Sequence, residues 1–142
     1  MTRVVNISKK RVSELPIDAP LISISDAYSV GVAIPNEKNR PLLKLEFFPR
    51  DHAPEISEER CMTQERAEKI FAFVEEQVAA GAEVIYVQCT EGRVRSFTIC
   101  ATVGQLDGVT HDHASSCIKS GIMDRYTYNI LGDELDKRLR AE

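Results

Sequence analysis

The sequence predicts an α/β protein in which a central, mostly parallel sheet of about four to five strands is flanked by helices. Apolar stretches of strand length alternate with amphipathic stretches of helical length, which is the pattern of layered α/β folds. One strand-like stretch, residues 83–88 (EVIYVQ), is apolar along most of its length, as expected for a parallel strand covered on both faces. The chain has 142 residues, so we expect residues 1–142 to form one domain.

The first half of the chain is rich in short strand patterns. Three stretches have the length and residue types of strands: 2–8 (TRVVNIS), 21–25 (LISIS) and 42–48 (LLKLEFF). One or two helical turns are expected at 9–15, and a further short strand at 30–34. Residues 49–62 contain two prolines and many charges, which predicts a long polar loop.

The second half predicts longer helices. The clearest runs from Thr63, a favourable N-cap, to Gly81, which suits the left-handed position after a helix. A buried helix is expected at 96–106 and another at about 111–120. A last helix is expected to bury a stripe made of Tyr128, Leu131, Leu135 and Leu139.

Composition excludes several classes of function. Hydrophobic residues make up 43% of the chain and charged residues 28%, which is typical of a soluble globular protein. The net charge of -4 argues against a nucleic-acid partner, because a phosphate backbone calls for a basic face. The sequence has no secretory signal, no apolar run long enough to span a membrane and no Cys-x-x-Cys pair. We therefore expect a cytoplasmic monomer with reduced thiols and no membrane partner.

A cysteine, an arginine and a serine lie on one short turn. In VIYVQCTEGRVRS, Cys89 follows the apolar strand, and Arg95 stands six residues later, directly before Ser96. The turn between a buried strand and a helix is where α/β sheets bind ligands, and the free N–H groups of the helix favour an anion. Arg95 can bind two phosphate oxygens at once, and Gly92 allows a backbone conformation that other residues resist. A thiol in such a positive field deprotonates readily, so Cys89 is expected to be a nucleophile.

This turn resembles the signature of the cysteine-dependent protein tyrosine phosphatases, usually written His-Cys-x5-Arg-Ser/Thr. The small dual-specificity-like (bacterial-type) branch is most similar, by chain length and by the late position of the signature, and LISISD and LLKLEFFPRD resemble its upstream strands. The resemblance implies one dual-specificity-phosphatase-like domain that hydrolyses phosphomonoesters through a phosphocysteine. It implies no cofactor and no metal, and a phosphorylated protein or small phosphomonoester as partner.

The resemblance assigns roles to individual residues. Cys89 matches the nucleophile, Arg95 the phosphate-binding arginine and Ser96 the hydroxyl that assists breakdown of the phosphocysteine. Five residues between them match the phosphate-binding loop: Thr90, Glu91, Gly92, Arg93 and Val94. The histidine that usually precedes the cysteine is Gln88 here, so we expect Gln88 to support the loop by hydrogen bonding and the thiolate to be weaker.

A general acid is also required, because the leaving group needs a proton and the attacking water must lose one. The resemblance implies an aspartate on a mobile loop upstream of the cysteine. Asp51 is the only aspartate at 49–62 and stands 38 residues before Cys89, so it is the predicted acid. Three carboxylates of the same loop are substitutes: Glu55, Glu58 and Glu59.

Two other functions are left open. A phosphate- or phosphoprotein-binding module would keep the loop with little turnover, and a sulfurtransferase would also use a cysteine loop, although the arginine spacing favours phosphate. The substrate is open as well, among phosphotyrosine, phosphoserine or phosphothreonine, inositol lipid and nucleotide phosphate. No metal site is expected at His111 and His113, because residues two apart diverge on a helix and no third ligand is nearby.

Overall fold

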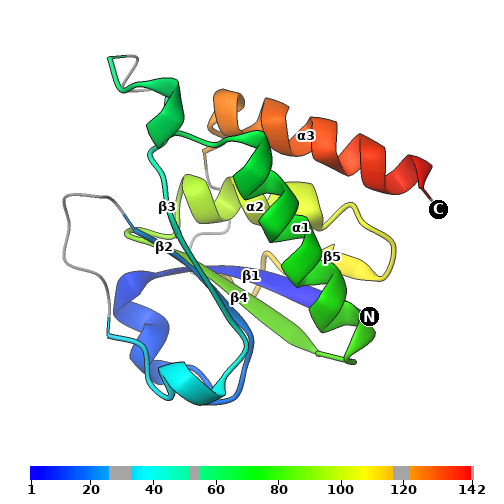
Figure 1. Cartoon of the computed structure of the whole chain (residues 1–142). Helices are drawn as coiled ribbons and strands as arrows, with labels where there is room; N and C mark the ends of the chain where they lie inside the picture. The colour runs from blue at the N-terminus through cyan, green and yellow to red at the C-terminus, as the bar shows by residue number, and fades with distance from the viewer. Residues whose placement is uncertain (26–32, 52–54, 117–121, 142) are drawn as a thin grey trace.

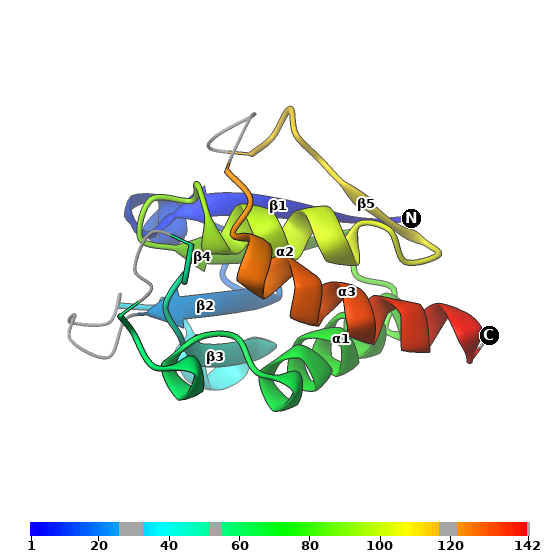
Figure 2. The ribbon, with the colours of Figure 1, turned by 90° about the horizontal axis from the view of Figure 1, so that it is seen from above.

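Five parallel strands form the central sheet of the computed structural model, which describes residues 1–25, 33–51, 55–116 and 122–141. The strands are β1 (Thr2–Ser8), β2 (Leu21–Ser25), β3 (Leu42–Glu46), β4 (Val84–Cys89) and β5 (Val109–His111). Their order in the sheet is β3-β2-β4-β1-β5, and every neighbouring pair is parallel. The predicted α/β sheet is therefore confirmed. The apolar strand β4 lies at its centre, between β2 and β1 (Figure 1; Figure 2).

The α-helices pack on one face of the sheet (Figure 1). They are α1 (Gln64–Ala79), α2 (Arg95–Val103) and α3 (Arg125–Arg140). Alternation along β4 sends Ile85, Val87 and Cys89 toward these helices. Val84 and Tyr86 point to the opposite face, where they pack with the short 3-10 helix η1 (Lys9–Glu14). Among the described helices, none has the length and apolar character needed to cross a bilayer.

Helix α1 has the two ends that the sequence predicts. The Thr63 hydroxyl accepts a hydrogen bond from the Arg66 N–H at 3.2 Å, as an N-cap does. After the last turn, Gly81 has a φ of +81°, the left-handed conformation that favours glycine. Both signals are local, so they are visible in the sequence.

The helix predicted at 111–120 is wrong. Residues 109–111 instead form strand β5, in which Val109 pairs with Thr2 of β1 and is 5% exposed. Turns follow at 113–115, and 117–121 lie outside the described residues. The edge of β1 offers unpaired backbone groups, and β5 satisfies them.

Three further predictions differ from the described structure or lie partly outside it. The strand predicted at 42–48 ends at Glu46, because the Phe48 N–H turns to the Arg60 carbonyl at 2.7 Å. The helix predicted at 96–106 ends at Val103. The strand predicted at 30–34 falls partly outside the described residues, and its described part, 33–34, has no regular structure.

The buried face of α3 contains half of the predicted apolar stripe, namely Leu131 and Leu135. Tyr128 and Leu139 are 37% and 40% exposed, whereas Thr127 and Glu134 are buried beside Leu131. The face that packs on α1 is thus partly polar. A prediction of the buried face from hydrophobicity alone does not include these polar residues.

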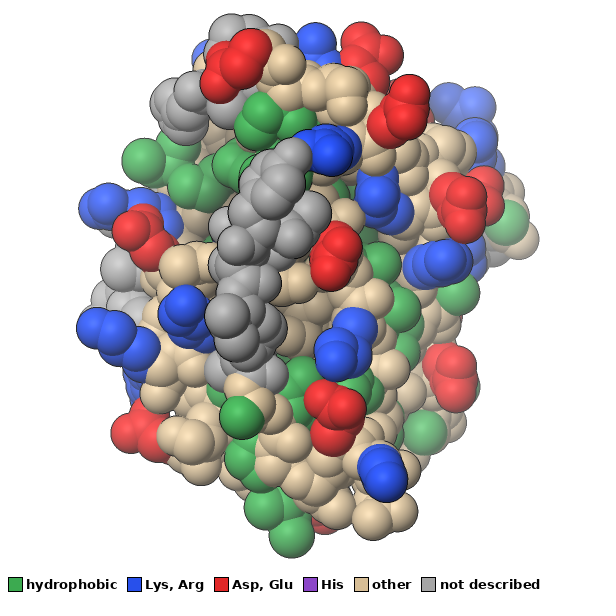
Figure 3. Space-filling model, turned by 60° about the vertical axis from the view of Figure 1, so that its left-hand side comes forward, with side chains coloured by type: hydrophobic (Ala, Val, Ile, Leu, Met, Phe, Trp, Pro, Cys, Tyr) green, Lys and Arg blue, Asp and Glu red, His purple; other side chains and the backbone are tan. Residues whose placement is uncertain are grey.

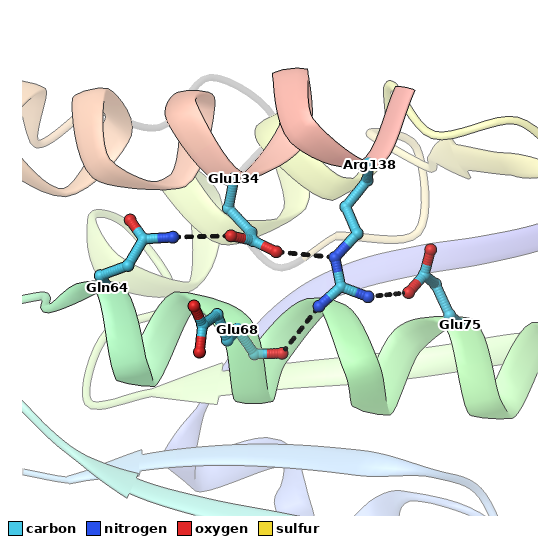
Figure 4. Close-up of polar contacts among 5 residues, drawn as sticks. All are labelled: Gln64, Glu68, Glu75, Glu134 and Arg138. Carbon is cyan, nitrogen blue, oxygen red and sulfur yellow. Dashed lines mark hydrogen bonds and ion pairs between the residues drawn. The ribbon is translucent and has the colours of Figure 1, made fainter. Parts of the chain in front are cut away.

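A hydrogen-bonded network explains why polar residues face α1 (Figure 4). The Glu134 carboxylate accepts hydrogen bonds from Gln64 of α1 at 2.6 Å and from Arg138 at 2.7 Å. Arg138 also pairs with Glu75 and donates to the Glu68 carbonyl. The buried Glu134 carboxylate is therefore paired with Arg138 of its own helix, and Arg138 in turn links α3 to Glu75 of α1.

Candidate active site

The central strand delivers Cys89 directly to the start of α2. Cys89 is the last residue of β4, α2 begins at Arg95, and residues 89–95 form the signature loop. The Cys89 Sγ lies 3.2 Å from the Ser96 hydroxyl and 3.5 Å from the Ser96 backbone nitrogen. Both residues are buried, at 3% and 0% exposure. The structure thus places a hydroxyl group against the thiol at the beginning of a helix.

Gly92 allows the signature loop to rest on the backbone of β1. Its φ is +72°. A Cβ at this position would lie 2.6 Å from the Ile7 carbonyl carbon and 2.7 Å from the Ser8 nitrogen, closer than real Cβ atoms approach. Both the conformation and the space therefore require glycine.

The outer side of the signature loop is held by donors from elsewhere. Three of its carbonyls accept hydrogen bonds: Thr90 from the Lys9 N–H at 3.2 Å, Gly92 from the Asn6 side chain at 2.7 Å, and Arg93 from the Ile122 N–H at 3.0 Å. In a trans peptide the N–H that follows a carbonyl points the opposite way. The N–H groups of residues 91, 93 and 94 are thereby turned to the inner side of the loop, which suits an anion.

Arg95 joins the signature loop to the end of β3. Its side chain is buried, at 6% exposure. The guanidinium donates to the Phe47 carbonyl at 3.0 Å and to the Thr90 hydroxyl at 3.4 Å. A planar donor fork is therefore held in place against the signature loop.

Gln88 has a different neighbourhood from Cys89. Alternation along β4 turns its side chain to the opposite face of the sheet. There its Oε1 accepts a hydrogen bond from the Ser23 hydroxyl of β2 at 2.5 Å, and the side chain is buried. Gln88 thus links two strands beneath the site.

Asn6 of β1 is a supporting residue that the sequence analysis missed. It is fully buried, and its Nδ2 donates to the Gly92 carbonyl. Its Oδ1 lies 2.7 Å from the Nε2 of His111. A carbonyl can only accept, so the Asn6 amide orientation is fixed and the His111 Nε2 must donate. The sequence signal for a special role of Asn6 is its position as a polar residue inside the apolar run VVNIS.

His111 is the titratable group behind Asn6. Burial, with a smaller contribution from His113, lowers the pKa of His111 to about 4, against the opposing effect of Asp112. His111 is therefore neutral near pH 7, and its Nδ1 is buried without a hydrogen-bond partner in the described structure.

The two histidines meet, contrary to prediction. Because β5 replaces the predicted helix, the ring centroids of His111 and His113 lie 3.9 Å apart, with Phe97 edge-on to both. Across residues 1–25, 33–51, 55–116 and 122–141, no group of three or more His, Cys, Asp or Glu residues is placed to hold a metal ion.

The Asp51 carboxylate lies at the N-terminus of α3. It accepts hydrogen bonds from the backbone N–H groups of Arg125 at 2.7 Å and Tyr126 at 3.4 Å. The positive end of the helix dipole favours an anion there. The three alternative carboxylates lie further along the same loop, exposed at Glu55 and within the 3-10 helix Glu58–Arg60 for Glu58 and Glu59.

The other described cysteines are buried thiols outside the signature loop. Cys61 and Cys100 are both 0% exposed. Burial, with a smaller contribution from Cys89, raises the pKa of the Cys100 thiol well above its ordinary value, so the thiol is protonated near neutral pH. Cys117 lies outside the described residues.

Comparisons with known proteins place the chain among α/β proteins with a phosphatase-like fold. A solved structure that shares this fold is a crystal structure of PTPMT1 in complex with PI(5)P. The TM-score is 0.54 at 14% sequence identity, and the match covers 92% of this chain and 86% of that one. No protein-family model and no curated protein matches the sequence. The likeness shows the fold, a five-stranded parallel sheet with flanking helices.

Proposed function

We propose that the protein is a phosphomonoester hydrolase of the protein-tyrosine or dual-specificity type, acting through a phosphocysteine at Cys89. The observation that carries the proposal is the Cys89 thiol beside the Ser96 hydroxyl, 3.2 Å apart, at the start of a helix. The inward N–H groups of the signature loop and the buried Arg95 fork provide the charge complement for a phosphate. The phosphatase-like fold supports the same chemistry.

The first chemical step transfers the phosphoryl group to sulfur. The Cys89 thiolate attacks phosphorus, so an S–P bond forms and the P–O bond to the leaving group breaks. The leaving oxygen takes a proton from the carboxyl group of the general acid, for which Asp51 remains our proposal. Arg95 binds two of the equatorial oxygens as the transfer proceeds.

The second step releases inorganic phosphate. A water molecule attacks phosphorus, the Asp51 carboxylate accepts a proton from this water, and the S–P bond breaks. The electron pair returns to sulfur as a thiolate. The Ser96 hydroxyl, 3.2 Å from the sulfur, donates a hydrogen bond to it.

Acid catalysis requires the Asp51 side chain to leave its two partners at the α3 N-terminus. Its two hydrogen bonds there are to backbone N–H groups at the helix start, on the exposed surface. Contacts of an exposed side chain are readily exchanged by a change of rotamer, which leaves the backbone of Asp51 in place. We propose that the unliganded protein keeps Asp51 on α3 and that bound substrate draws it toward the leaving group.

We propose a phosphorylated protein as substrate, with PI(5)P-like lipids as the alternative, since PTPMT1 was solved with PI(5)P. Figure 3 looks toward the strand ends from which the loops after β1 and β4 leave, and it shows basic and acidic side chains interspersed. Glu91 and Arg93 of the signature loop are exposed, and so is Lys9 beside it. This mixed rim does not select a substrate by charge alone, so rates on phosphotyrosine peptide, phosphothreonine peptide and PI(5)P must decide.

Hydrolysis of p-nitrophenyl phosphate tests the proposal. The wild-type protein should turn it over, and Cys89→Ser should abolish turnover while phosphate and vanadate still bind, because the cradle is backbone and Arg95. Cys100→Ser, a second buried thiol on α2, is the matched control and should retain activity. Near wild-type rates in Cys89→Ser would reject the covalent mechanism.

A binding module is the second candidate, and the position of Asp51 favours it. The proposed acid is engaged by α3. If this contact persists with ligand bound, the loop would hold phosphate without turnover. Phosphate binding in a wild-type protein that hydrolyses none of the substrates named above would identify this function.

A further inference from the structure

Asp124 is a buried carboxylate that contacts two segments at once. It is 1% exposed. Its Oδ1 accepts hydrogen bonds from the N–H groups of Arg50 at 3.0 Å and Asp51 at 2.9 Å. Its Oδ2 accepts from the Thr127 N–H at 3.2 Å and from the Thr127 hydroxyl. One oxygen therefore holds the backbone at Asp51, and the other caps α3.

The backbone of Asp124 continues these contacts to the signature loop. Its N–H donates to the Thr98 hydroxyl oxygen at 3.0 Å, and the Thr98 hydroxyl donates to the Val94 carbonyl at 2.7 Å. Thr98 is fully buried. A chain of hydrogen bonds thus runs from the loop that would bind phosphate, through Thr98 and Asp124, to the backbone of Asp51.

An ordinary N-cap does not need this arrangement. A cap requires one acceptor for one N–H group of the first turn, and Ser, Thr or Asn serves as well as Asp. Asp124 meets four donors, two on each oxygen. Only a carboxylate can accept on both sides, because an asparagine would turn an NH₂ group toward one pair of donors.

We propose that Asp124 is a positioning residue for the general acid: by holding the backbone N–H groups of Arg50 and Asp51, it sets where the Asp51 carboxyl group meets the leaving group. This inference rests on the proposed phosphatase function with Asp51 as the acid. Asp124 itself touches no reacting atom. Its effect on catalysis must therefore pass through Asp51.

The test compares good and poor leaving groups. General acid catalysis contributes about 10²–10⁴-fold, mainly when the leaving group is a strong base. Asp124→Asn should slow hydrolysis of an alkyl phosphate by roughly 10-fold or more, within that range, and change p-nitrophenyl phosphate little. Thr127→Val keeps the contacts to Arg50 and Asp51, so it should lower thermal stability without altering the ratio of the two rates.

A double variant asks whether Asp124 acts through Asp51. Asp51→Asn alone should show the same leaving-group dependence, and adding Asp124→Asn should lower the alkyl rate little further, because coupled residues are not additive. Asp136→Asn, an exposed aspartate on the same helix, is the control and should match wild type. Equal losses on both substrates, or losses that multiply in the double variant, would reject the positioning role.

Amide hydrogen exchange gives a readout that does not depend on catalysis. The N–H groups of Arg50 and Asp51 should exchange faster in Asp124→Asn than in wild type, and at the wild-type rate in Thr127→Val and Asp136→Asn. Unchanged exchange in Asp124→Asn overturns this inference alone. A wild-type protein without turnover overturns the proposed function, and the inference with it, even if exchange behaves as expected.

Discussion

Arg95 is oriented by hydrogen bonds to two different elements, the Phe47 carbonyl after β3 and the Thr90 hydroxyl in the signature loop. A side chain with this many rotatable bonds loses considerable freedom when it is ordered. Here the side chain loses this conformational freedom when the protein folds. Under the proposed function, the guanidinium is therefore preorganised for a phosphate.

Arg95→Lys should impair catalysis severely. A lysine carries the same charge but offers a point donor in place of a planar fork. Loss of one preorganised donor to a transition state costs about 10²–10³-fold, so kcat/KM for p-nitrophenyl phosphate should fall by at least 10²-fold. Arg140→Lys, exposed at the end of α3, is the control. Unchanged kinetics in Arg95→Lys would remove this arginine from the site.

Asn6→Asp should weaken both the fold and the site. The substitution keeps the shape of a fully buried side chain but replaces the donor to the Gly92 carbonyl with an acceptor. Leaving a buried polar group unsatisfied costs about 1–3 kcal/mol, which urea unfolding should detect. Asn129→Asp, exposed on α3, is the matched control. If the two variants unfold alike, Asn6 does not hold the loop.

The contacts at the site differ in how visible they are in the sequence. Cys89 ends a strand and Ser96 lies in the first turn of the next helix, seven positions later in the sequence. The short turn between them brings the two side chains together, so their spacing predicts the contact. Asn6 reaches Gly92 only because β1 pairs with β4, and Asp124 reaches Asp51 only because α3 packs beside α2. Contacts that depend on tertiary packing cannot be predicted from the spacing of residues in the sequence.

At the scale of elements, the sequence predicted α1 well and β5 not at all. Thr63 and Gly81 mark the ends of α1 by local chemistry that does not depend on neighbours. A three-residue edge strand such as β5 is too short to show a period, and its assignment depends on pairing with β1. For the same reason the polar face of α3 depends on α1 and is invisible in α3 alone.

The network between α1 and α3 should contribute to stability rather than to catalysis. Glu134→Ala would leave the partly buried Arg138 and Gln64 without their shared acceptor. Because the Arg138 side chain keeps 25% exposure and can reach water, we expect a loss of about 1–3 kcal/mol in unfolding free energy. Turnover per folded molecule should not change. Asp136→Ala on the exposed side of α3 controls for helix propensity, and equal stability of the two variants would contradict a role for the network.

At the scale of the whole molecule, His111 should make stability depend on pH. Its folded pKa is lowered from 6.5 to about 4, chiefly by burial. Between pH 4 and 6.5, His111 therefore binds a proton in the unfolded chain but not in the folded protein. The unfolding free energy must then fall as pH drops from about 6.5 toward 4. Hydrogen bonds from Ser115 and then Arg3 lower the pKa of Asp112 to about 2. The contribution of Asp112 to stability is therefore lost only below its ordinary pKa of 3.8, outside this window.

Urea unfolding at several pH values measures this linkage. One proton corresponds to a slope of about 1.4 kcal/mol per pH unit, which is the upper limit for His111. His111→Gln should reduce the slope between pH 4 and 6.5, and His113→Asn should reduce it less, because His113 is the smaller cause of the lowered pKa. A slope that is the same in wild type and His111→Gln would show that another group carries the dependence.

The same fold occurs in PTPMT1 at 14% identity, which shows that the sheet and helices tolerate wide sequence change. Function belongs to the residues placed on such a fold rather than to the fold itself. Here the loop after β4 carries the thiol, the inward N–H groups and the arginine at the C-terminal edge of the sheet. The proposed function therefore depends on what this loop does.

Trapping the phosphoryl group on Cys89 tests the central claim most directly. The wild-type protein is mixed with p-nitrophenyl phosphate, quenched in acid during turnover, digested and analysed by peptide mass spectrometry. The account predicts a phosphoryl group on the thiol of the peptide that contains Cys89, and none on peptides that contain Cys61 or Cys100. Turnover that leaves Cys89 unmodified at every quench time, and that persists in Cys89→Ser, would contradict it.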